Sequence, residues 1–519
     1  MRMHRMLWAV VAGVMPLAGG DCPGLAKLTL PATTITVAEE VTAGTFQPPG
    51  GKELTKLPTF CRVAGVIKPS SDSNIRLEVW LPAQGWNSKF QGIGNGGFAG
   101  FIGYGGLADA VRNGYTAAST DTGHEAAPLD AGWALGHPEK VIDYGYRAIH
   151  EMTLKGKALA EAYYGAKPKR SYFNACSNGG RQALMEAQRY PEDYDGVIAG
   201  APANHLTHLA GLFVSDMQAT AGNPVSYIPQ AKLAAIQAAA LAACDKLDGV
   251  ADGLIEDPTA CRFDPARLLC QGPENNTCLT AGQVKALQKL YDGVRDQKGR
   301  LLYPGLAMGG EADAGGWGPW ITGPEPEKST MFALGTSYYK NMVFGDPAWD
   351  YKKFKVDTDL KTAVEKTGRV LNATDPDLRR FEARGGKLIL YHGWCDAAIP
   401  AQATIDYYQS VVRKMGAKRA AGFARLFMAP GMQHCQGGAG PNTFGQSGVA
   451  RGDAGSNISA ALERWVEKGE APEVIVASRG SGAGALTHPL CAYPKVARFK
   501  GTGSTDAAAS FECVLEGKR

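Results

Sequence analysis

Several common features are missing from this chain of 519 residues. Its 11 cysteines form no Cys-x-x-Cys motif and no zinc-like Cys/His spacing, which excludes a cysteine-based zinc site. No long basic run occurs, and the net charge of +4 is a near balance of 54 basic and 50 acidic residues. We therefore expect no nucleic-acid partner. Internal repeats and low-complexity tracts are absent too, and the composition, 45% hydrophobic and 20% charged, is that of a folded globular protein.

Long apolar segments are also absent, apart from a short one at the amino terminus. Residues 1–20 combine a basic start, the apolar stretch Leu7–Ala18 and a pair of glycines. This pattern is typical of a secretory signal peptide, cleaved here before Asp21. The stretch is too short to span a bilayer comfortably. We therefore expect no membrane anchor and a secreted or periplasmic mature protein.

Export changes the interpretation of the 11 cysteines, because disulfides persist in oxidising compartments. An odd number of cysteines is most simply divided into five disulfides and one free thiol, and we expect Cys395 to be the free one. Short loops favour local pairs, and one more pair would close the N-terminal segment, although connectivity does not follow from sequence alone. The pairs expected on this ground are Cys22–Cys61, Cys244–Cys261, Cys270–Cys278 and Cys491–Cys513.

Strand and helix patterns alternate through the first two hundred residues, which predicts a mostly parallel sheet with helices on both faces. The expected strands cover residues 75–81, 89–93, 115–119, 170–175 and 194–200, and a long helix covers 140–162. The rhythm breaks after Pro202 and resumes with strands over 387–391 and 425–428. We therefore predict an α/β fold in which residues 204–384 form an insertion over the edge where α/β enzymes bind ligands.

The most informative motif is the run Ala175-Cys176-Ser177-Asn178-Gly179-Gly180, between an expected strand and a helix over 180–190. A small-x-Ser-x-Gly turn of this kind holds its serine in strained backbone geometry, which requires small residues two before and two after it. The strain projects the hydroxyl above the sheet and aims the N–H of Asn178 at a developing oxyanion. We therefore predict that Ser177 is a nucleophile.

A serine nucleophile needs a base to take its proton and an acidic residue to orient that base. α/β-hydrolases supply these partners in the chain order Ser, Asp, His. Here Asp396 and His434 follow the two late strands in that order, which predicts them as the acid and the base. His392 is the alternative base, but its place at a strand end favours a packing role.

Cysteines adjoin both the predicted nucleophile and the predicted base. Cys176 directly precedes Ser177, and Cys435 directly follows His434. A disulfide between these two cysteines would hold the serine and the histidine side by side. This shared adjacency makes the serine motif much more specific than a small-x-Ser-x-Gly string alone.

A second donor for the oxyanion is expected in the loop Gly94-Asn95-Gly96-Gly97-Phe98, which follows a strand. It resembles the Gly-rich oxyanion loops of esterases, and a bare turn is the plainer interpretation. We choose the N–H of Gly97, with Gly96 as the alternative. The loop does not fit a dinucleotide fingerprint, because no helix with a following acidic residue has the required layout. We therefore expect no organic cofactor.

The insertion carries two candidate binding features. Trp317 and Trp320 lie in a Trp/Gly-rich stretch and could floor an aromatic pocket, with packing inside the insertion as the alternative. Acidic residues alternate with glycines over residues 245–254, and such a loop can wrap a hard cation, although a solvated turn is the alternative. We predict a structural Ca²⁺ bound by Asp245, Asp248 and Asp252 and by the carbonyls of Val250 and Leu254.

Three motifs together, Cys176-Ser177-x-Gly179-Gly180, His392-Gly-Trp-x-Asp396 and His434-Cys435, resemble the tannase and feruloyl esterase family. That family also contains bacterial hydrolases of mono(2-hydroxyethyl) terephthalate. The likeness covers nearly the whole mature chain. It implies an α/β-hydrolase fold with a catalytic domain over 21–203 and 385–519 and a large inserted lid domain over 204–384. It further implies the triad Ser177–Asp396–His434, the bridge Cys176–Cys435 and Ca²⁺ in the lid.

The resemblance also implies an activity and a kind of substrate. It points to a secreted serine esterase that hydrolyses small esters of aromatic acids, such as hydroxycinnamic or gallic acid, through an acyl-enzyme. A terephthalate monoester hydrolase of the same family is one alternative, and an acyltransferase or carboxypeptidase-like serine enzyme is another. A non-catalytic binding protein on a hydrolase fold is a further class, against which the complete Ser, Asp and His set argues.

Overall fold

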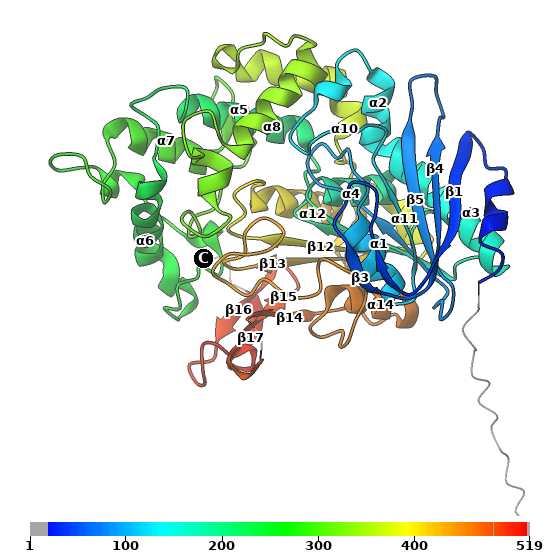
Figure 1. The fold of residues 1–519 in the computed structure, drawn as a ribbon. Helices are drawn as coiled ribbons and strands as arrows, with labels where there is room; N and C mark the ends of the chain where they lie inside the picture. Colours follow the sequence, from blue (N-terminus) through cyan, green and yellow to red (C-terminus); the bar gives the residue numbers. More distant parts are fainter. Residues whose placement is uncertain (1–18, 481, 516–519) are drawn as a thin grey trace, which may run out of the picture.

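A nine-stranded sheet runs through the middle of the molecule (Figure 1), seen in a computed structural model that describes residues 19–480 and 482–515. The predicted signal peptide therefore lies outside the described residues, apart from Gly19 and Gly20. The strand order is β1-β4-β5-β7-β6-β8-β9-β12-β13. The strands are β1 (Thr33–Val41), β4 (Phe60–Ile67), β5 (Ile75–Pro82), β6 (Lys89–Ile93), β7 (Thr116–Thr120), β8 (Arg170–Cys176), β9 (Gly196–Gly200), β12 (Lys387–Gly393) and β13 (Ala424–Ala429).

Six of these strands, from β7 through β13 in the sheet order, run parallel to one another. At the other edge, β1, β4 and β5 pair antiparallel, and β5 also pairs antiparallel with β7. The prediction of a mostly parallel sheet is confirmed. The antiparallel edge was not predicted, and it arises where a short connection (residues 68–74) returns the chain as a hairpin, which parallel strands cannot form.

Helices cover both faces of the sheet, as predicted. Apolar side chains of α3, α4 and α12 share one buried cluster with the sheet, and those of α1 and α14 share another. The sheet is thus the middle of three layers. The helices outside residues 204–384 are α1 (Tyr104–Arg112), α2 (Pro138–Ile142), α3 (Ala148–Tyr164), α4 (Asn178–Arg189), α12 (Ala401–Met415), α13 (Ala417–Phe423) and α14 (Ile458–Lys468).

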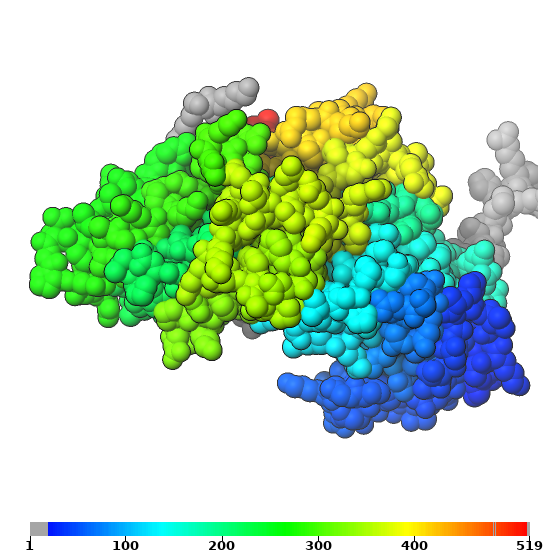
Figure 2. Space-filling view, turned by 90° about the horizontal axis from the view of Figure 1, so that it is seen from above, coloured from blue at the N-terminus to red at the C-terminus, as the bar shows by residue number. Residues whose placement is uncertain are grey.

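Residues 204–384 add no strand to the nine-stranded sheet and have a buried apolar cluster that also takes in Phe98, Tyr144 and residues 397–399. Figure 2 shows the green and yellow-green atoms of this segment gathered on one side of the molecule, away from the blue N-terminal strands. Its elements are α5 (Leu206–Ala219), α6 (Leu233–Cys244), α7 (Ala281–Asp292), β10 (Val294–Arg295), β11 (Leu301–Tyr303), α8 (Thr330–Tyr338), α9 (Lys361–Ala363), α10 (Arg369–Leu371) and α11 (Arg379–Ala383).

Small two-stranded sheets complete the fold. The C-terminal pairs β14–β15 and β16–β17 lie below β13 in Figure 1, and β2 pairs with β3 near the N-terminus. No helix in the described part of the chain has both the length and the apolar character needed to cross a membrane. These strands are β2 (Gly44–Phe46), β3 (Leu54–Leu57), β14 (Val474–Arg479), β15 (Leu486–Cys491), β16 (Lys495–Phe499) and β17 (Phe511–Leu515).

The long helix predicted over residues 140–162 is interrupted. A π-helical turn, Asp143–Arg147, separates α2 from α3. The carbonyls of Tyr144 and Gly145 in this turn accept hydrogen bonds from the buried guanidinium of Arg181. Such turns often lie at functional sites, and this one belongs to the network under the candidate active site described below.

Five disulfides are present, and they are the five predicted pairs. Cys395 is free and buried, as expected. Burial raises the pKa of its thiol well above the ordinary value, so the thiol stays protonated and unreactive.

Candidate active site

Ser177 occupies the sharp turn between β8 and α4. Its backbone has φ 67° and ψ −125°, a left-handed φ that only strong local constraints impose on a serine. A Cβ on Gly179 would lie 2.5 Å from the Cβ of Ala175, and one on Gly180 would lie 2.3 Å from the carbonyl oxygen of Gly200. The turn therefore requires the two glycines, and it has the geometry expected of a nucleophile elbow.

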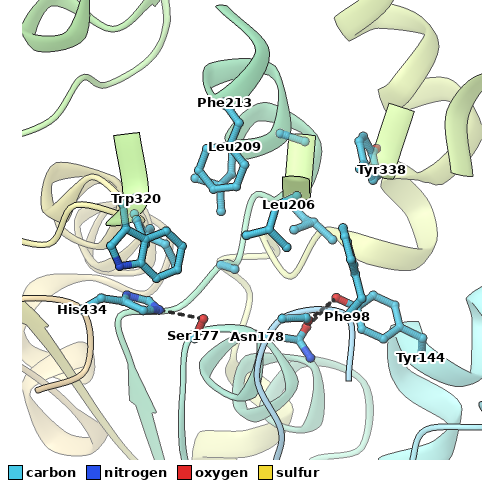
Figure 3. A pocket seen from close by; sticks show the side chains of 16 residues that line it. Phe98, Tyr144, Ser177, Asn178, Leu206, Leu209, Phe213, Trp320, Tyr338 and His434 are labelled. Carbon is cyan, nitrogen blue, oxygen red and sulfur yellow. Dashed lines mark hydrogen bonds between the residues drawn. The ribbon is translucent and has the colours of Figure 1, made fainter. Parts of the chain in front are cut away.

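A hydrogen-bonded relay links the three residues predicted as a triad. Ser177 Oγ lies 2.9 Å from His434 Nε2, and His434 Nδ1 lies 2.8 Å from Asp396 Oδ2. Figure 3 shows the imidazole beside the serine hydroxyl at the base of a pocket. If Nδ1–H donates to the carboxylate, Nε2 is left to accept the serine proton. The three side chains follow β12, β13 and β8, so the sheet brings together residues 257 positions apart.

The Asp396 carboxylate is buried but well supported. Its Oδ1 accepts hydrogen bonds from the backbone N–H groups of Ala398 (2.8 Å) and Ile399 (2.9 Å). Burial alone would raise the pKa of Asp396, but the charges and hydrogen bonds of His434 and His392 lower it below its ordinary value. Asp396 is therefore ionised, and it can stabilise an imidazolium on His434.

His392 supports the acid and does not contact the serine. Its Nε2 lies 3.1 Å from Asp396 Oδ2 and 3.0 Å from the carbonyl oxygen of Ile399, while its Nδ1 lies 2.7 Å from Thr404 Oγ1. Because both neighbours of Nε2 are acceptors, Nε2 carries the proton. The sequence predicted a packing role for His392, and the structure adds that it orients Asp396.

The disulfide between Cys176 and Cys435 joins the nucleophile elbow directly to the loop that carries the base. It closes a sequence separation of 259 residues, with 6.0 Å between the two Cα atoms. Cys435 has a left-handed backbone, φ 64°, as Ser177 does. The bridge thus fixes two strained turns against each other, and it restricts how far His434 can move from Ser177.

The two residues predicted to bind the oxyanion, Asn178 and Gly97, both line the cavity that contains Ser177. Asn178 is the first residue of α4, so its N–H has no acceptor within the helix and lies at the positive end of the helix dipole. Gly97 lines the same cavity as Ser177 and Asn178, whereas Gly96 does not. Gly97 has φ 56°, and a Cβ there would lie 2.3 Å from the carbonyl oxygen of Pro128. The structure therefore favours Gly97 over Gly96 as the second donor.

Asn95 anchors the Gly-rich loop to α4. Its backbone N–H donates to Gln182 Oε1 (3.1 Å), and Gln182 Nε2 donates back to Asn95 Oδ1 (2.7 Å). Its Nδ2 also donates to the carbonyl oxygen of Thr120 (2.7 Å). Asn95, Gln182 and Thr120 are all buried, so the loop that carries Gly97 is held firmly beside the elbow.

The cavity above Ser177 and His434 has almost entirely apolar walls (Figure 3). The Trp320 ring lies edge-on to the His434 ring, with 5.1 Å between centroids. The Tyr338 hydroxyl lies 2.6 Å from Thr367 Oγ1, and Thr367 does not line the cavity. The other apolar or aromatic lining residues are Phe98, Tyr144, Ala203, Leu206, Leu209, Ala210, Phe213, Leu334, Ala398 and Ile399.

Comparison with known proteins places this site in a family. A family profile described as "Tannase and feruloyl esterase" matches residues 61–514. The chain belongs to the tannase and feruloyl esterase family. It is 42% identical to an uncharacterized esterase of Xanthomonas campestris pv. campestris, over 96% of this chain and 92% of that protein. It is 32% identical to a probable feruloyl esterase B-2 of Aspergillus terreus, over 99% of each chain.

A solved structure agrees with this assignment. The crystal structure of feruloyl esterase B from Aspergillus oryzae superposes with a TM-score of 0.88 at 30% identity, covering 95% of this chain and 99% of that one. The predicted α/β-hydrolase fold and the family resemblance are thus confirmed. As a member of the family, the protein is a carboxylic ester hydrolase.

The two tryptophans of this esterase have different places. Trp320 lines the cavity, as the sequence suggested. Trp317 does not line it: its side chain is 2% exposed and packs against Tyr291, with ring centroids 5.6 Å apart. The prediction that Trp317 lines the pocket together with Trp320 is therefore wrong. The two side chains point in different directions because Gly318–Thr322 is a π-helical turn. In an α-helix residues three apart share a face, but in the wider i→i+5 turn they do not.

The acidic loop of the esterase, residues 245–254, is ordered by its own backbone. Asp245 accepts hydrogen bonds from the N–H groups of Asp252 and Gly253, at 3.1–3.2 Å. Burial, with the nearby carboxylates of Asp252 and Glu256, raises the pKa of Asp248 to about 7. The donors are all oxygen atoms, and the crowded negative charge is what a hard divalent cation would neutralise. Oxygen donors of this kind suit Ca²⁺, but Asp245, Asp248 and Asp252 are not among the groups of three described residues whose ligand atoms lie within 4.8 Å of one another.

One group of His, Glu and Asp side chains in the described residues does bring its ligand atoms together, and this group was not predicted. His150, Glu186 and Asp193 each place one ligand atom within 4.8 Å of the others, and His150 Nδ1 lies 2.6 Å from Asp193 Oδ2. Glu186 is at the far end of α4 from Ser177. Burial and the Asp193 carboxylate raise the pKa of Glu186 well above its ordinary value, so a proton already neutralises this carboxyl.

Several residues of the site were beyond sequence reasoning. Tyr144 and the apolar residues of α5 come from segments that carry no recognisable motif, and Arg181 directly follows the elbow motif. The position of Arg181, four residues after the nucleophile, was the one available hint. One helical turn is about 5.4 Å long, so a residue four positions after the nucleophile has its backbone close to the elbow.

Proposed function

We propose that the protein is an exported serine esterase that hydrolyses esters of aromatic acids, as feruloyl esterases and tannases do. The observation that carries the proposal is the relay from Asp396 through His434 to Ser177 at the base of an apolar, aromatic-lined cavity. The relay supplies an activated nucleophile, and the cavity supplies a place for an aryl acyl group.

The geometry supports acyl transfer in two half-reactions. Ser177 Oγ attacks the ester carbonyl while His434 Nε2 takes its proton, and Asp396 stabilises the imidazolium. The N–H groups of Asn178 and Gly97 bind the oxyanion of the tetrahedral intermediate. As the intermediate collapses, His434 gives its proton to the departing alcohol. Water then repeats the sequence on the acyl-enzyme, and the free acid leaves.

The lining of the cavity favours a neutral aromatic acyl group. Trp320 and Phe98 offer aromatic faces, and α5 adds the side chains of Leu206, Leu209 and Phe213. No lysine or arginine is among the lining residues in the described part of the chain. A terephthalate monoester carries a free carboxylate, which would be costly to bury there without a cation. Hydroxycinnamic and related acyl groups are therefore the preferred class over terephthalate monoesters.

We also propose that residues 204–384 act as a lid with a structural calcium site. The segment supplies most of the apolar wall above Ser177. Ca²⁺ would be held by Asp245, Asp248 and Asp252 with the carbonyls of Val250 and Leu254. It would stiffen the loop that follows α6, which the Cys244–Cys261 bridge closes. The ion would supply structural stability only, because this chain's own Ser177 and His434 perform the chemistry.

The proposed location is the periplasm or the extracellular space. Five disulfides favour an oxidising compartment over the cytosol. The composition of residues 1–20 adds the expected export signal.

Hydrolysis of a small ester panel tests the function. Methyl ferulate, methyl gallate, mono(2-hydroxyethyl) terephthalate and a p-nitrophenyl alkanoate would be compared for wild type and Ser177→Ala. We expect kcat/KM to be highest on an aromatic ester, and a loss of turnover of roughly 10⁴-fold or more in the variant. Analysis of products in the presence of added alcohols separates hydrolysis from acyl transfer. A fluorophosphonate probe that failed to label Ser177 would overturn the enzyme mechanism itself.

A further inference from the structure

Four cationic side chains are buried in the described part of the chain, and one of them has no carboxylate partner. That one is Arg181, with 0% of its surface exposed. Burying an unpaired charge is costly, so such a group needs a compensating role. The three paired cations are Arg62 with Glu39 and Glu78, Lys155 with Glu151, and Lys232 with Glu274.

Neutral groups surround the Arg181 guanidinium. It donates hydrogen bonds to Asn178 Oδ1 (2.8 Å), to the carbonyl oxygen of Gly145 (2.7 Å) and to that of Tyr144 (3.1 Å). It also lies over the Tyr144 ring, 4.7 Å from the centroid. These partners accept hydrogen bonds from Nε, Nη1 and Nη2 but carry no formal charge. The positive charge of Arg181 therefore remains uncancelled, and a guanidinium stays protonated even when buried.

Arg181 lies within one helical turn of the proposed oxyanion site. Its backbone N–H donates to the carbonyl oxygen of Ser177 (3.1 Å), so it belongs to the first turn of α4. The residue that its Nε–H binds, Asn178, supplies one of the two proposed oxyanion donors. The guanidinium also lies on the protein side of this site, because it does not line the cavity.

The same network reaches the second donor. The Tyr144 hydroxyl lies 3.0 Å from Asn178 Oδ1 and 3.0 Å from the carbonyl oxygen of Gly97 (Figure 3). Arg181 in turn fixes Tyr144 through its carbonyl and its ring. Both halves of the oxyanion site are thus attached to one buried cation.

We propose that Arg181 is a positioning residue of the oxyanion hole, whose uncancelled charge stabilises the tetrahedral intermediate through Asn178 and Tyr144. The inference rests on the proposed esterase function. An ester carbonyl is neutral, so the charge of Arg181 contributes little to substrate binding. A full negative charge develops only in the transition state, and a fixed cation in a water-poor site then stabilises it selectively.

Arg181 variants test the proposal by separating charge from hydrogen bonding. Arg181→Gln keeps an amide donor but removes the charge, Arg181→Met removes both, and Arg181→Lys keeps the charge. We expect kcat to fall about 10- to 100-fold in the Gln and Met variants, with KM within about threefold of wild type. The Lys variant should recover most of the loss. Affinity for an aryl boronic acid, which forms a tetrahedral anion on Ser177, should fall in the same order as kcat.

Rates are expressed per active site, counted by fluorophosphonate labelling of Ser177 carried to completion. This separates lost catalysis from lost folded protein, and failure of wild type to label would refute the esterase mechanism rather than the role of Arg181. Arg62→Met is the matched control: it removes a buried arginine that has carboxylate partners, and it should lower the melting temperature without changing kcat per site.

Two results would overturn the proposal. One is wild-type kcat per site in Arg181→Gln, and the other is an Arg181→Lys variant no better than Arg181→Gln. If no Arg181 variant folds, the kinetics of Asn178→Ala test the proposal, because this substitution removes the side chain through which the guanidinium acts. A lowered kcat with unchanged KM supports the proposal there, and an unchanged kcat refutes it.

Discussion

The cavity of this esterase has two walls that are built in different ways. The lower wall carries Ser177 and His434, and Asp396 is buried behind His434; the three residues follow three strands of the sheet and are held by directional hydrogen bonds. The upper wall comes from residues 204–384 and consists of apolar contacts, with Trp320 nearest to His434. Hydrogen bonds weaken steeply with angle, whereas apolar contacts do not depend on direction. The difference indicates that the lower wall sets the chemistry and the upper wall sets the choice of acyl group.

A change of one atom in the triad is expected to have the largest effect. Asp396→Asn should lower kcat about 10³–10⁴-fold on every ester, because an amide favours the wrong tautomer of His434. The measurement is kcat on an aryl and an alkyl ester. Asp193→Asn is the matched control, since Asp193 is a buried partner of His150 at the other end of α4 and should affect stability alone. Equal losses in the two variants would contradict the proposed triad.

Removing the Cys176–Cys435 bridge should have a smaller effect on the same wall. The double variant to alanine keeps all three triad residues but frees the loop of His434, and a misplacement of about 1 Å can cost up to about 100-fold. We expect kcat to fall about 10- to 100-fold on both esters, with the far-ultraviolet circular dichroism unchanged. The Cys270–Cys278 double variant, which opens a short bridge in residues 204–384, should keep wild-type kcat. Full activity without Cys176–Cys435 would show that the sheet alone positions the base.

A change in the upper wall should alter selectivity instead of rate. Trp320→Ala removes an aromatic face above His434, and we expect kcat/KM to fall about tenfold on aryl esters and little on alkyl esters. The ratio of the two kcat/KM values is the quantity to measure. Trp317→Phe, three residues earlier but buried outside the cavity, should leave this ratio unchanged. If Trp320→Ala instead lowered kcat/KM equally on aryl and alkyl esters, the role of Trp320 would be to support His434.

Chelation of calcium should give the smallest change in activity. With EDTA, we expect the melting temperature to fall by a few degrees and kcat to change less than about twofold, since loss of a ligand that binds the native state lowers stability. Adding back Ca²⁺ should restore the melting temperature, whereas Mg²⁺ should not, because it requires a stricter octahedral geometry. In Asp248→Asn the response to Ca²⁺ should weaken. A melting temperature that changes with neither EDTA nor Ca²⁺ would contradict the proposed calcium site.

Much of the fold was predictable because its cues are local. Alternating patterns gave the parallel strands within one or two residues, and the elbow motif identified the turn at Ser177. The antiparallel edge of β1 and β4 was not predicted, and neither was the π-helical turn Asp143–Arg147. Both depend on partners distant in sequence, because strand pairing and a widened helical turn are stabilised by tertiary contacts rather than by propensity.

The sequence by itself determined the order and spacing of Ser177, Asp396 and His434, because an elbow, a strand end and an adjacent cysteine each constrain only neighbouring residues. The folded structure was needed to show that Trp320 rather than Trp317 and Gly97 rather than Gly96 line the cavity, and that Arg181 is buried without a carboxylate partner. The physical reason is that burial and electrostatic environment are properties of packing. They depend on side chains from segments as distant as residues 97, 144, 181 and 320, which no local pattern brings together.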